Sequence, residues 1–296
     1  MKFSIIIPTY NNLDSLTFLI NSLKKNSSFD HEIVLHINDG SDGTLDYAIK
    51  NNIKHTHSVN NIGLCSAMNK AYHLTTSNYI LYAHDDMFFC DNWDLFLIEE
   101  IDKYDHNLYY LTGTNISTRF GLINYDCGNS ISNFNEKKFN LFCQNDKTPD
   151  LQGSHWAPHL IHRELWNKIG GFSEEFNPGD GSDPDLCMKL WLSGVRIFKG
   201  ISKFKVYHFN SLTTRNSKIK LNNGTKQFMF KYGFNPKFFR KHYLRGDNSI
   251  IPYIGKLNDP ELLDKLSITE PVLPQELESA IKISQDGNPN LIIAKL

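Results

Sequence analysis

The feature that most constrains the fold is a regular alternation of strand and helix patterns over the first 90 residues. Continuous apolar runs, such as FSIIIP (3–8), EIVLHIN (32–38) and YILYAH (79–84), are typical of strands buried in a parallel sheet. The segments between them place apolar residues at helical spacing, and Asn12 is expected to cap the first of these helices. This alternation predicts parallel βαβ units with right-handed crossovers. We therefore expect an α/β fold with a mostly parallel central sheet.

Three polar loops follow the ends of these strands: PTYNN (8–12), NDGSDGT (38–44) and HDDM (84–87). In open parallel sheets, ligands bind beyond the carboxyl ends of the strands, so these loops are expected to converge on one site. The adjacent carboxylates of Asp85 and Asp86 need a cation, a hydrogen-bond network or water. A pair of hard oxygen donors suits Mg²⁺ or Mn²⁺, although a solvated turn at the strand end would use the same residues.

Two further segments offer functional groups, and each also has a structural interpretation. Asp39 lies in a glycine-rich turn, where it either closes an Asx turn or accepts N–H groups from a nucleobase. In NPGDGSDPD (177–185), Ser182 or Asp183 is expected to cap a helix whose first residue is Pro184. A carboxylate at that position is also well placed to act as a general base. His208 ends a short apolar run and is either structural or a metal ligand.

Composition narrows the class of protein. Lys and Arg number 31 against 32 for Asp and Glu in 296 residues, and this balance does not favour a nucleic-acid partner. The five cysteines lack metal-ligand spacing and predict reduced thiols. No apolar run approaches the roughly 20 residues of a membrane span. We therefore expect a cytoplasmic protein, at most peripheral at the membrane, and the sequence leaves its oligomeric state open.

The pattern changes along the second half of the chain. A helix is expected over 91–104, and residues 113–150 are interpreted as long loops with a hairpin. From about residue 216 the alternation is lost, and a basic, aromatic segment is followed by short helices. We expect one domain over 1–215, with a donor-binding half to about 110 and an acceptor-side half to 215. A mostly helical extension would occupy 216–296.

The motifs in this order resemble the inverting glycosyltransferases of family 2, which have the GT-A fold, a Rossmann-like sandwich. FSIIIPTYNN resembles their first strand, NDGSDGT their base-binding loop and NNIGLCSAMNKAY their N-x-G-x-x-x-A-R-N segment. YAHDDM resembles their DxD metal motif, GGFSEEFNPGDGSDPDLCMKLWLSG their acceptor segment and VYHFNS a late strand with a histidine. The resemblance covers residues 3 to about 210 and implies a nucleoside diphosphate sugar donor (UDP, dTDP or GDP) and a Mn²⁺ or Mg²⁺ ion. It also implies a hydroxyl acceptor on a glycan, polysaccharide or lipid-linked sugar.

The resemblance also assigns residues. Asp183 would be the base, and Asp86 and His208 would bind the metal. Trp156 and Asp185 are expected on the acceptor side, and Asp185 is the reserve candidate for the base. The predicted donor-binding residues are Pro8, Thr9, Tyr10, Asn12, Asp39, Gly40, Ser41, Asn61, Asn69 and Asp85. In two places the chain departs from the family pattern, because His84 replaces the first DxD aspartate and Met68 replaces an arginine.

Two other functions compete with this interpretation. A sugar nucleotidyltransferase shares the paired aspartates but would carry a glycine-rich, basic phosphate loop after the first strand, and PTYNN is not such a loop. A catalytically inactive carbohydrate-binding homologue would account for His84 and Met68, but the presence of Asp39, Asp86 and Asp183 together argues against it.

Overall fold

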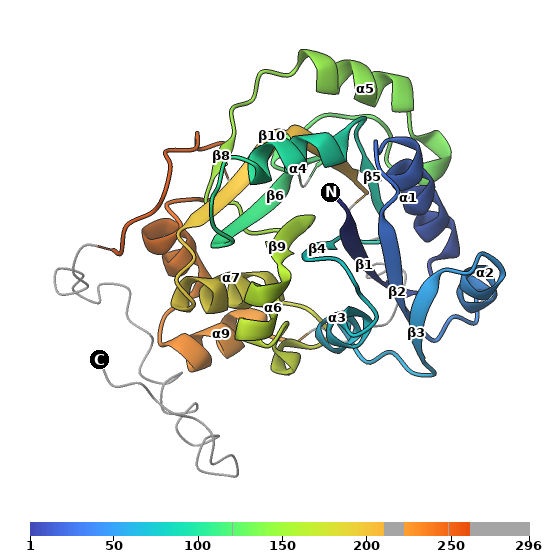
Figure 1. The fold of residues 1–296 in the computed structure, drawn as a ribbon, viewed down its shortest axis with the longest axis horizontal. Helices are drawn as coiled ribbons and strands as arrows, with labels where there is room; N and C mark the ends of the chain where they lie inside the picture. The colour runs from blue at the N-terminus through green and yellow to red at the C-terminus, as the bar shows by residue number, and fades with distance from the viewer. Residues whose placement is uncertain (120, 210–221, 248, 261–296) are drawn as a thin grey trace, which may run out of the picture.

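A computed structural model of the chain describes residues 1–119, 121–209, 222–247 and 249–260. These residues contain a central sheet of mixed direction, covered by helices (Figure 1). The strands are β1 (Phe3–Tyr10), β2 (Glu32–Asn38), β3 (Lys54–Ser58), β4 (Tyr79–Tyr82), β5 (Met87–Phe89), β6 (Tyr109–Ser117), β7 (Ile123–Asn124), β8 (Leu151–Gln152), β9 (His159–His162) and β10 (Ile197–His208). The helices are α1 (Leu13–Lys25), α2 (Thr44–Lys50), α3 (Leu64–Tyr72), α4 (Trp93–Ile101), α5 (Glu136–Asn145), α6 (Arg163–Ile169), α7 (Ser182–Leu192), α9 (Gly224–Tyr232) and α10 (Pro236–Phe238).

The strand order in the sheet is β3-β2-β1-β4-β9-β6-β10-β5, with β7 and β8 attached to β6 and β10. The first four strands in this order are parallel, as the alternation predicted. β9 runs antiparallel to both neighbours, β6 and β10 are parallel, and β5 is antiparallel to β10. The mostly parallel α/β sheet predicted from the sequence is therefore confirmed.

Helices bury both faces of the sheet, which explains why its strands are continuous apolar runs. α3 packs on β1 and β2, whereas α4 and α5 pack against β10. Figure 1 shows α1, α4 and α5 along one side of the sheet and α3, α6 and α7 along the other. The apolar face of α1, which includes Leu16, Ile20 and Leu23, is buried, as its helical spacing indicated.

The region 113–150 is more regular than the sequence suggested. β6 continues to Ser117, and α5 forms where only loops and a hairpin were expected. The side chain of Asn135 caps α5 by accepting a hydrogen bond from the Lys138 N–H at 2.9 Å. Phe139 anchors the helix in the core beside Phe134. The expectation was wrong because Phe139 also packs against Phe88 and Tyr207, which lie far away in the sequence, and such contacts outweigh weak local propensity.

The described part of the extension is helical and lies against α7. α9 and α10 are followed by a π-helical turn (Phe239–Tyr243), and Phe228 and Phe239 are fully buried. The remainder of the predicted extension, residues 216–221, 248 and 261–296, lies outside the described residues, so the domain boundary stays a prediction. Among the helices described, none is long and apolar enough to cross a membrane.

Candidate active site

The parallel register brings the ends of β1, β2 and β4 to one edge of the sheet. β1 pairs with both other strands, so its last residues lie beside the loops that follow them. The Thr9 hydroxyl donates a hydrogen bond of 2.7 Å to the Asp85 carboxylate, which also receives one from the Asn12 side chain. Burial and repulsion by Asp86 raise the pKa of Asp85. Three predicted donor-binding residues therefore meet, and Asp85 is turned toward β1.

The position of Asn12 corrects one expectation about α1. The sequence indicated that this side chain caps the helix, and Asn12 does occupy the cap position, but its side chain makes no capping hydrogen bond. The Leu13 N–H instead donates to the Asp42 carboxylate at 2.8 Å. The capping group thus comes from the loop after β2, a partner that local sequence could not identify.

Asp39 adopts the Asx turn that the sequence allowed, while its carboxylate stays partly exposed. The Ser41 N–H donates to one carboxylate oxygen at 3.2 Å, and the Asn11 amide donates to the other at 3.0 Å. Hydrogen bonds from Ser41 and Asn11 lower the pKa of Asp39, so the group is a carboxylate at neutral pH. Gly40 follows with φ 81° and donates its N–H to the Asn11 side chain. Each carboxylate oxygen has two lone pairs, so the turn is compatible with binding a further donor.

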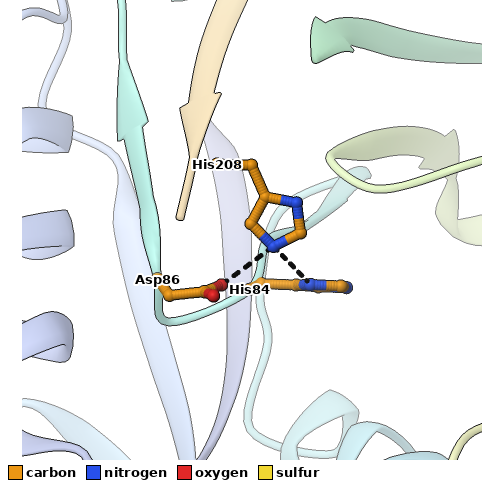
Figure 2. Close-up of side chains that lie close together, drawn as sticks. All are labelled: His84, Asp86 and His208. Carbon is orange, nitrogen blue, oxygen red and sulfur yellow. Dashed lines mark hydrogen bonds and ion pairs between the residues drawn. The ribbon is translucent and has the colours of Figure 1, made fainter. Parts of the chain in front are cut away.

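Next to Asp85 lies a cluster of three potential metal ligands: His84, Asp86 and His208. The His208 Nε2 atom lies 3.0 Å from an Asp86 oxygen and 3.3 Å from Nδ1 of His84 (Figure 2). These residues meet because β5 runs antiparallel to β10, with Met87 opposite His208. The Phe209 N–H also donates to the Asp86 carbonyl oxygen at 3.1 Å, and this bond links the end of β10 to the loop before β5.

The geometry of this cluster fits a divalent cation, and its two histidines differ in protonation. Ligand atoms about 2.1 Å from an octahedral ion lie about 3.0 Å apart at neighbouring positions, close to the 3.0 and 3.3 Å separations here. Burial lowers the pKa of His84 to about 4, so its ring is neutral at neutral pH. For His208, burial opposes the charge, but the combined attraction by Asp86, Asp85 and Asp183 outweighs it and raises the pKa.

Asp86 and His208 were predicted as metal ligands, whereas His84 was treated only as a departure from a family pattern. The signal that could have identified it is its residue type and place, because histidine is the commonest metal ligand and His84 lies in the same short loop as the paired carboxylates. The intervening Asp85 bonds to Thr9 instead.

The glycine-rich loop before α7 places Asp183 differently from the prediction. The helix begins at Ser182, its cap residue is Gly181 with φ 83°, and no side chain caps it. The Ser182 hydroxyl donates backward to the Gly179 carbonyl at 2.7 Å. The expectation that Ser182 or Asp183 caps a helix starting at Pro184 is therefore wrong. A glycine in the left-handed region turns the chain into the helix without a side-chain cap.

Asp183 therefore lies in the first turn of α7, and its carboxylate does not cap the helix. Burial raises the pKa of Asp183 to about 7, and the nearby His208 partly opposes this rise. A carboxyl group with a pKa near the working pH is suited to proton transfer. The pKa of Asp183 responds to the charge of His208, so Asp183 lies within electrostatic range of the His84–Asp86–His208 cluster.

Asp185 lies two residues further along α7 and serves a different contact. Its carboxylate is almost fully buried and accepts hydrogen bonds from the Tyr232 hydroxyl at 2.7 Å and the Lys231 ammonium at 2.8 Å. Asp180 fastens the same loop, because its carboxylate accepts the Gly224 N–H at 2.8 Å. α9 thus holds the segment that carries Asp183, and an acceptor-side role for Asp185 stays a prediction.

The remaining predicted residues lie around this edge. Asn61 accepts the Gly63 N–H at 2.9 Å and shapes the turn before α3. Asn69 bonds to both the N–H and the carbonyl of Phe172, at 2.9 Å each, and so fastens α3 to the loop after α6. Met68 is fully buried in the core. Its position thus offers no group for a ligand.

Three other predicted positions are partly exposed. Pro8 and Tyr10 lie at the end of β1, the strand that carries Thr9. Trp156 donates its indole N–H to the Gly113 carbonyl at 3.3 Å. Their predicted roles toward donor and acceptor are compatible with this exposure and stay predictions.

Comparison with known proteins agrees with this arrangement. A family model described as glycosyl transferase family 2 matches residues 4–170, more than half of the chain. The search of curated proteins found no match.

Among solved structures, S. aureus TarS 1-349 in complex with UDP is similar over 81% of this chain and 74% of its own, with 18% identity and a TM-score of 0.54. Its complex with UDP-GlcNAc matches at 17% identity and a TM-score of 0.51, over 81% and 75% of the chains. GalNAc-T7 with UDP, GalNAc and Mn²⁺ is similar over 95% of this chain but 54% of its own, with 16% identity and a TM-score of 0.56. These likenesses establish a shared fold.

Proposed function

Because this chain belongs to glycosyl transferase family 2 and is a glycosyltransferase with the GT-A fold, we propose that it transfers a sugar from a nucleoside diphosphate sugar to an acceptor hydroxyl. The reaction uses a divalent cation and inverts the configuration of the sugar. The acceptor is a glycan, a polysaccharide or a lipid-linked sugar. The observation that carries this proposal is the meeting of a carboxyl group of raised pKa, Asp183, with the His84–Asp86–His208 cluster in one site.

The donor is held at the edge formed by β1 and β2. The Asp39 carboxylate accepts N–H groups from the nucleobase, with Asn11 and Ser41 keeping it ionised and oriented. A charge-assisted hydrogen bond of this kind contributes roughly 1.5 to 3 kcal/mol. Thr9 orients Asp85 beside the diphosphate.

The Asp86 and His208 side chains would hold the divalent cation. When bound, the cation neutralises the negative charge that develops on the leaving diphosphate. Among the protein groups, Asp86 supplies negative charge, and His208 supplies a nitrogen donor once it has released its proton.

Asp183 acts as the general base. Its carboxylate removes the proton of the incoming acceptor hydroxyl, and its pKa of about 7 allows this at neutral pH. Attack from the face opposite the diphosphate inverts the anomeric centre in a single displacement, as in inverting hydrolysis with an acceptor hydroxyl in place of water.

UDP is the first nucleotide to test, because solved relatives of this fold carry UDP, UDP-GlcNAc or UDP with Mn²⁺. A thermal-shift screen with UDP, dTDP and GDP, each with and without Mn²⁺, identifies the base, because a ligand raises the melting temperature only if it binds the native state. Release of nucleoside diphosphate from the matching sugar donor, with added glycan acceptors, then measures turnover.

Two variants make this experiment decisive. Asp86→Ala should lose the metal-dependent stabilisation by nucleoside diphosphate, whereas Asp105→Ala, an exposed carboxylate in the loop after α4, should keep it. Full metal-dependent activity of Asp86→Ala would refute the proposed site. Binding of nucleotide without any sugar transfer would favour the inactive carbohydrate-binding homologue, and release of pyrophosphate would favour a nucleotidyltransferase.

A further inference from the structure

We propose that His84 is a third protein ligand of the metal site and makes that site select a first-row transition metal over Mg²⁺. The inference rests on the proposed function, because it concerns the cation of the same reaction. His84 stands two residues before Asp86, and its Nδ1 atom is directed at His208 at 3.3 Å (Figure 2). The three donor atoms all lie within 4.8 Å of one another, as the ligands of a single ion do.

The orientation of the His84 ring is set by its neighbours. The ring contacts Tyr82 with centroids 5.2 Å apart and His208 with centroids 5.0 Å apart, at an interplanar angle of 76°. Tyr82 is itself almost fully buried and packs against His159, so it forms a rigid support under the ring. A donor atom held by packing binds a metal at little further entropic cost.

The neighbouring carboxylate does not take the place of His84. Asp85 receives hydrogen bonds from Thr9 and Asn12, and these draw it toward β1, away from the cluster. The ligand set therefore consists of one carboxylate and two imidazoles, with a single negative charge from the protein.

This ligand set decides which cation is favoured. Mg²⁺ prefers oxygen ligands and gives up its waters reluctantly, so two imidazole nitrogens contribute little to binding it. First-row transition metals accept nitrogen ligands, and their affinity for a given site rises from Mn²⁺ to Co²⁺. We therefore expect affinity to increase in the order Mg²⁺, Mn²⁺, Co²⁺. Because the protein provides only one charge, we also expect the diphosphate to strengthen metal binding, and metal and UDP should raise each other's affinity by the same factor.

The test measures metal binding directly. Free Mn²⁺ is followed by electron paramagnetic resonance as it is titrated into the protein with and without UDP, and Mg²⁺ is then added as a competitor. His84→Ala should weaken Mn²⁺ binding by roughly tenfold or more, since even groups that only orient a ligand contribute 10- to 100-fold. Its affinity for Mg²⁺ should change far less. His84→Asp, which supplies an oxygen ligand, should lower the ratio of Mn²⁺ to Mg²⁺ affinity by about tenfold.

The controls separate this inference from the proposed function. His73→Ala removes an exposed histidine at the end of α3 and should leave both affinities unchanged.

Asp86→Ala should abolish binding of either metal. If Asp86→Ala does so but His84→Ala and His84→Asp both bind Mn²⁺ and Mg²⁺ as the wild type does, His84 is not a ligand and the inference is overturned, while the proposed function stands. If the wild type binds neither metal in the presence of UDP, the proposed metal site itself fails. His84→Asn, which keeps a polar side chain of similar reach, replaces His84→Ala if that variant does not fold.

Discussion

Replacing Asp183 by Asn should make the protein more stable and less active at the same time. The carboxyl group is held at a pKa of about 7 instead of 3.8, because burial penalises its charged form. The folded state therefore binds a proton more readily than the unfolded state, and stability falls as the pH rises from about 4 toward 7. Asn cannot ionise, so the variant avoids this loss.

The size of the gain follows from the pKa. One pKa unit corresponds to about 1.4 kcal/mol, so the ionised carboxyl costs on the order of 4 kcal/mol above pH 7, and solvent reaching this partly exposed group reduces that figure. Near pH 5 the cost is less than about 2 kcal/mol, because the pH is then only about one unit above the unfolded pKa and the folded state keeps its proton. The stabilisation by Asp183→Asn should therefore grow between pH 5 and pH 8.

Urea denaturation of the metal-free protein at these two pH values measures the stability, and sugar transfer at pH 8 measures the activity. Loss of a general base typically lowers kcat by about 10² to 10⁴. In the wild type, kcat should also fall as the pH drops below about 7, where Asp183 becomes protonated. A stability gain that is absent or independent of pH would refute the burial argument, and an unchanged kcat would refute the role as base.

Asp185→Asn provides a matched control on the same helix. Asp185 is more deeply buried than Asp183, but its carboxylate is paired with Lys231 and Tyr232. The substitution removes the charge that Asp185 shares with Lys231, although the ammonium keeps its ion pair with Glu175, and it should lower the free energy of unfolding by about 1 to 3 kcal/mol. The two substitutions should thus change stability in opposite directions.

Three further predictions concern the donor, the acceptor and α9. Asp39→Asn keeps the Asx turn but removes the charge, so the KM for the donor should rise about tenfold, corresponding to roughly 1.5 kcal/mol; unchanged donor affinity would leave Asp39 as a turn residue only. Trp156→Ala should raise the KM for the acceptor while the dissociation constant of UDP, measured by calorimetry, stays the same, and equal losses for both ligands would argue against an acceptor-side role. Lys231→Met should lower kcat without raising the donor KM, because it frees Asp185 and the start of α7 that carries Asp183; wild-type turnover in a variant of lowered melting temperature would show that the contact only stabilises the fold.

The sequence by itself determined the parallel half of the sheet and the edge at which its polar loops meet. Buried parallel strands must be continuous apolar runs, and the residues that follow them must lie at one edge, so Thr9, Asp39 and Asp86 could be placed from local patterns alone. Local patterns did not predict the helix ends correctly, because the side-chain caps predicted for α1 and α7 were wrong. Which group satisfies a helix end depends on a loop that is distant in the sequence or on a glycine conformation.

Only the tertiary structure decided which site residues are in contact and how strongly each of them binds a proton. His84 and His208 are 124 positions apart, and they meet because β10 runs back along β5 and ends opposite Met87. Asp183 owes its raised pKa to the protein packed around it, and the same residue type two positions later becomes part of a buried ion pair. Ligand geometry and proton affinity depend on neighbours in space, and the sequence lists those neighbours without showing which of them are in contact.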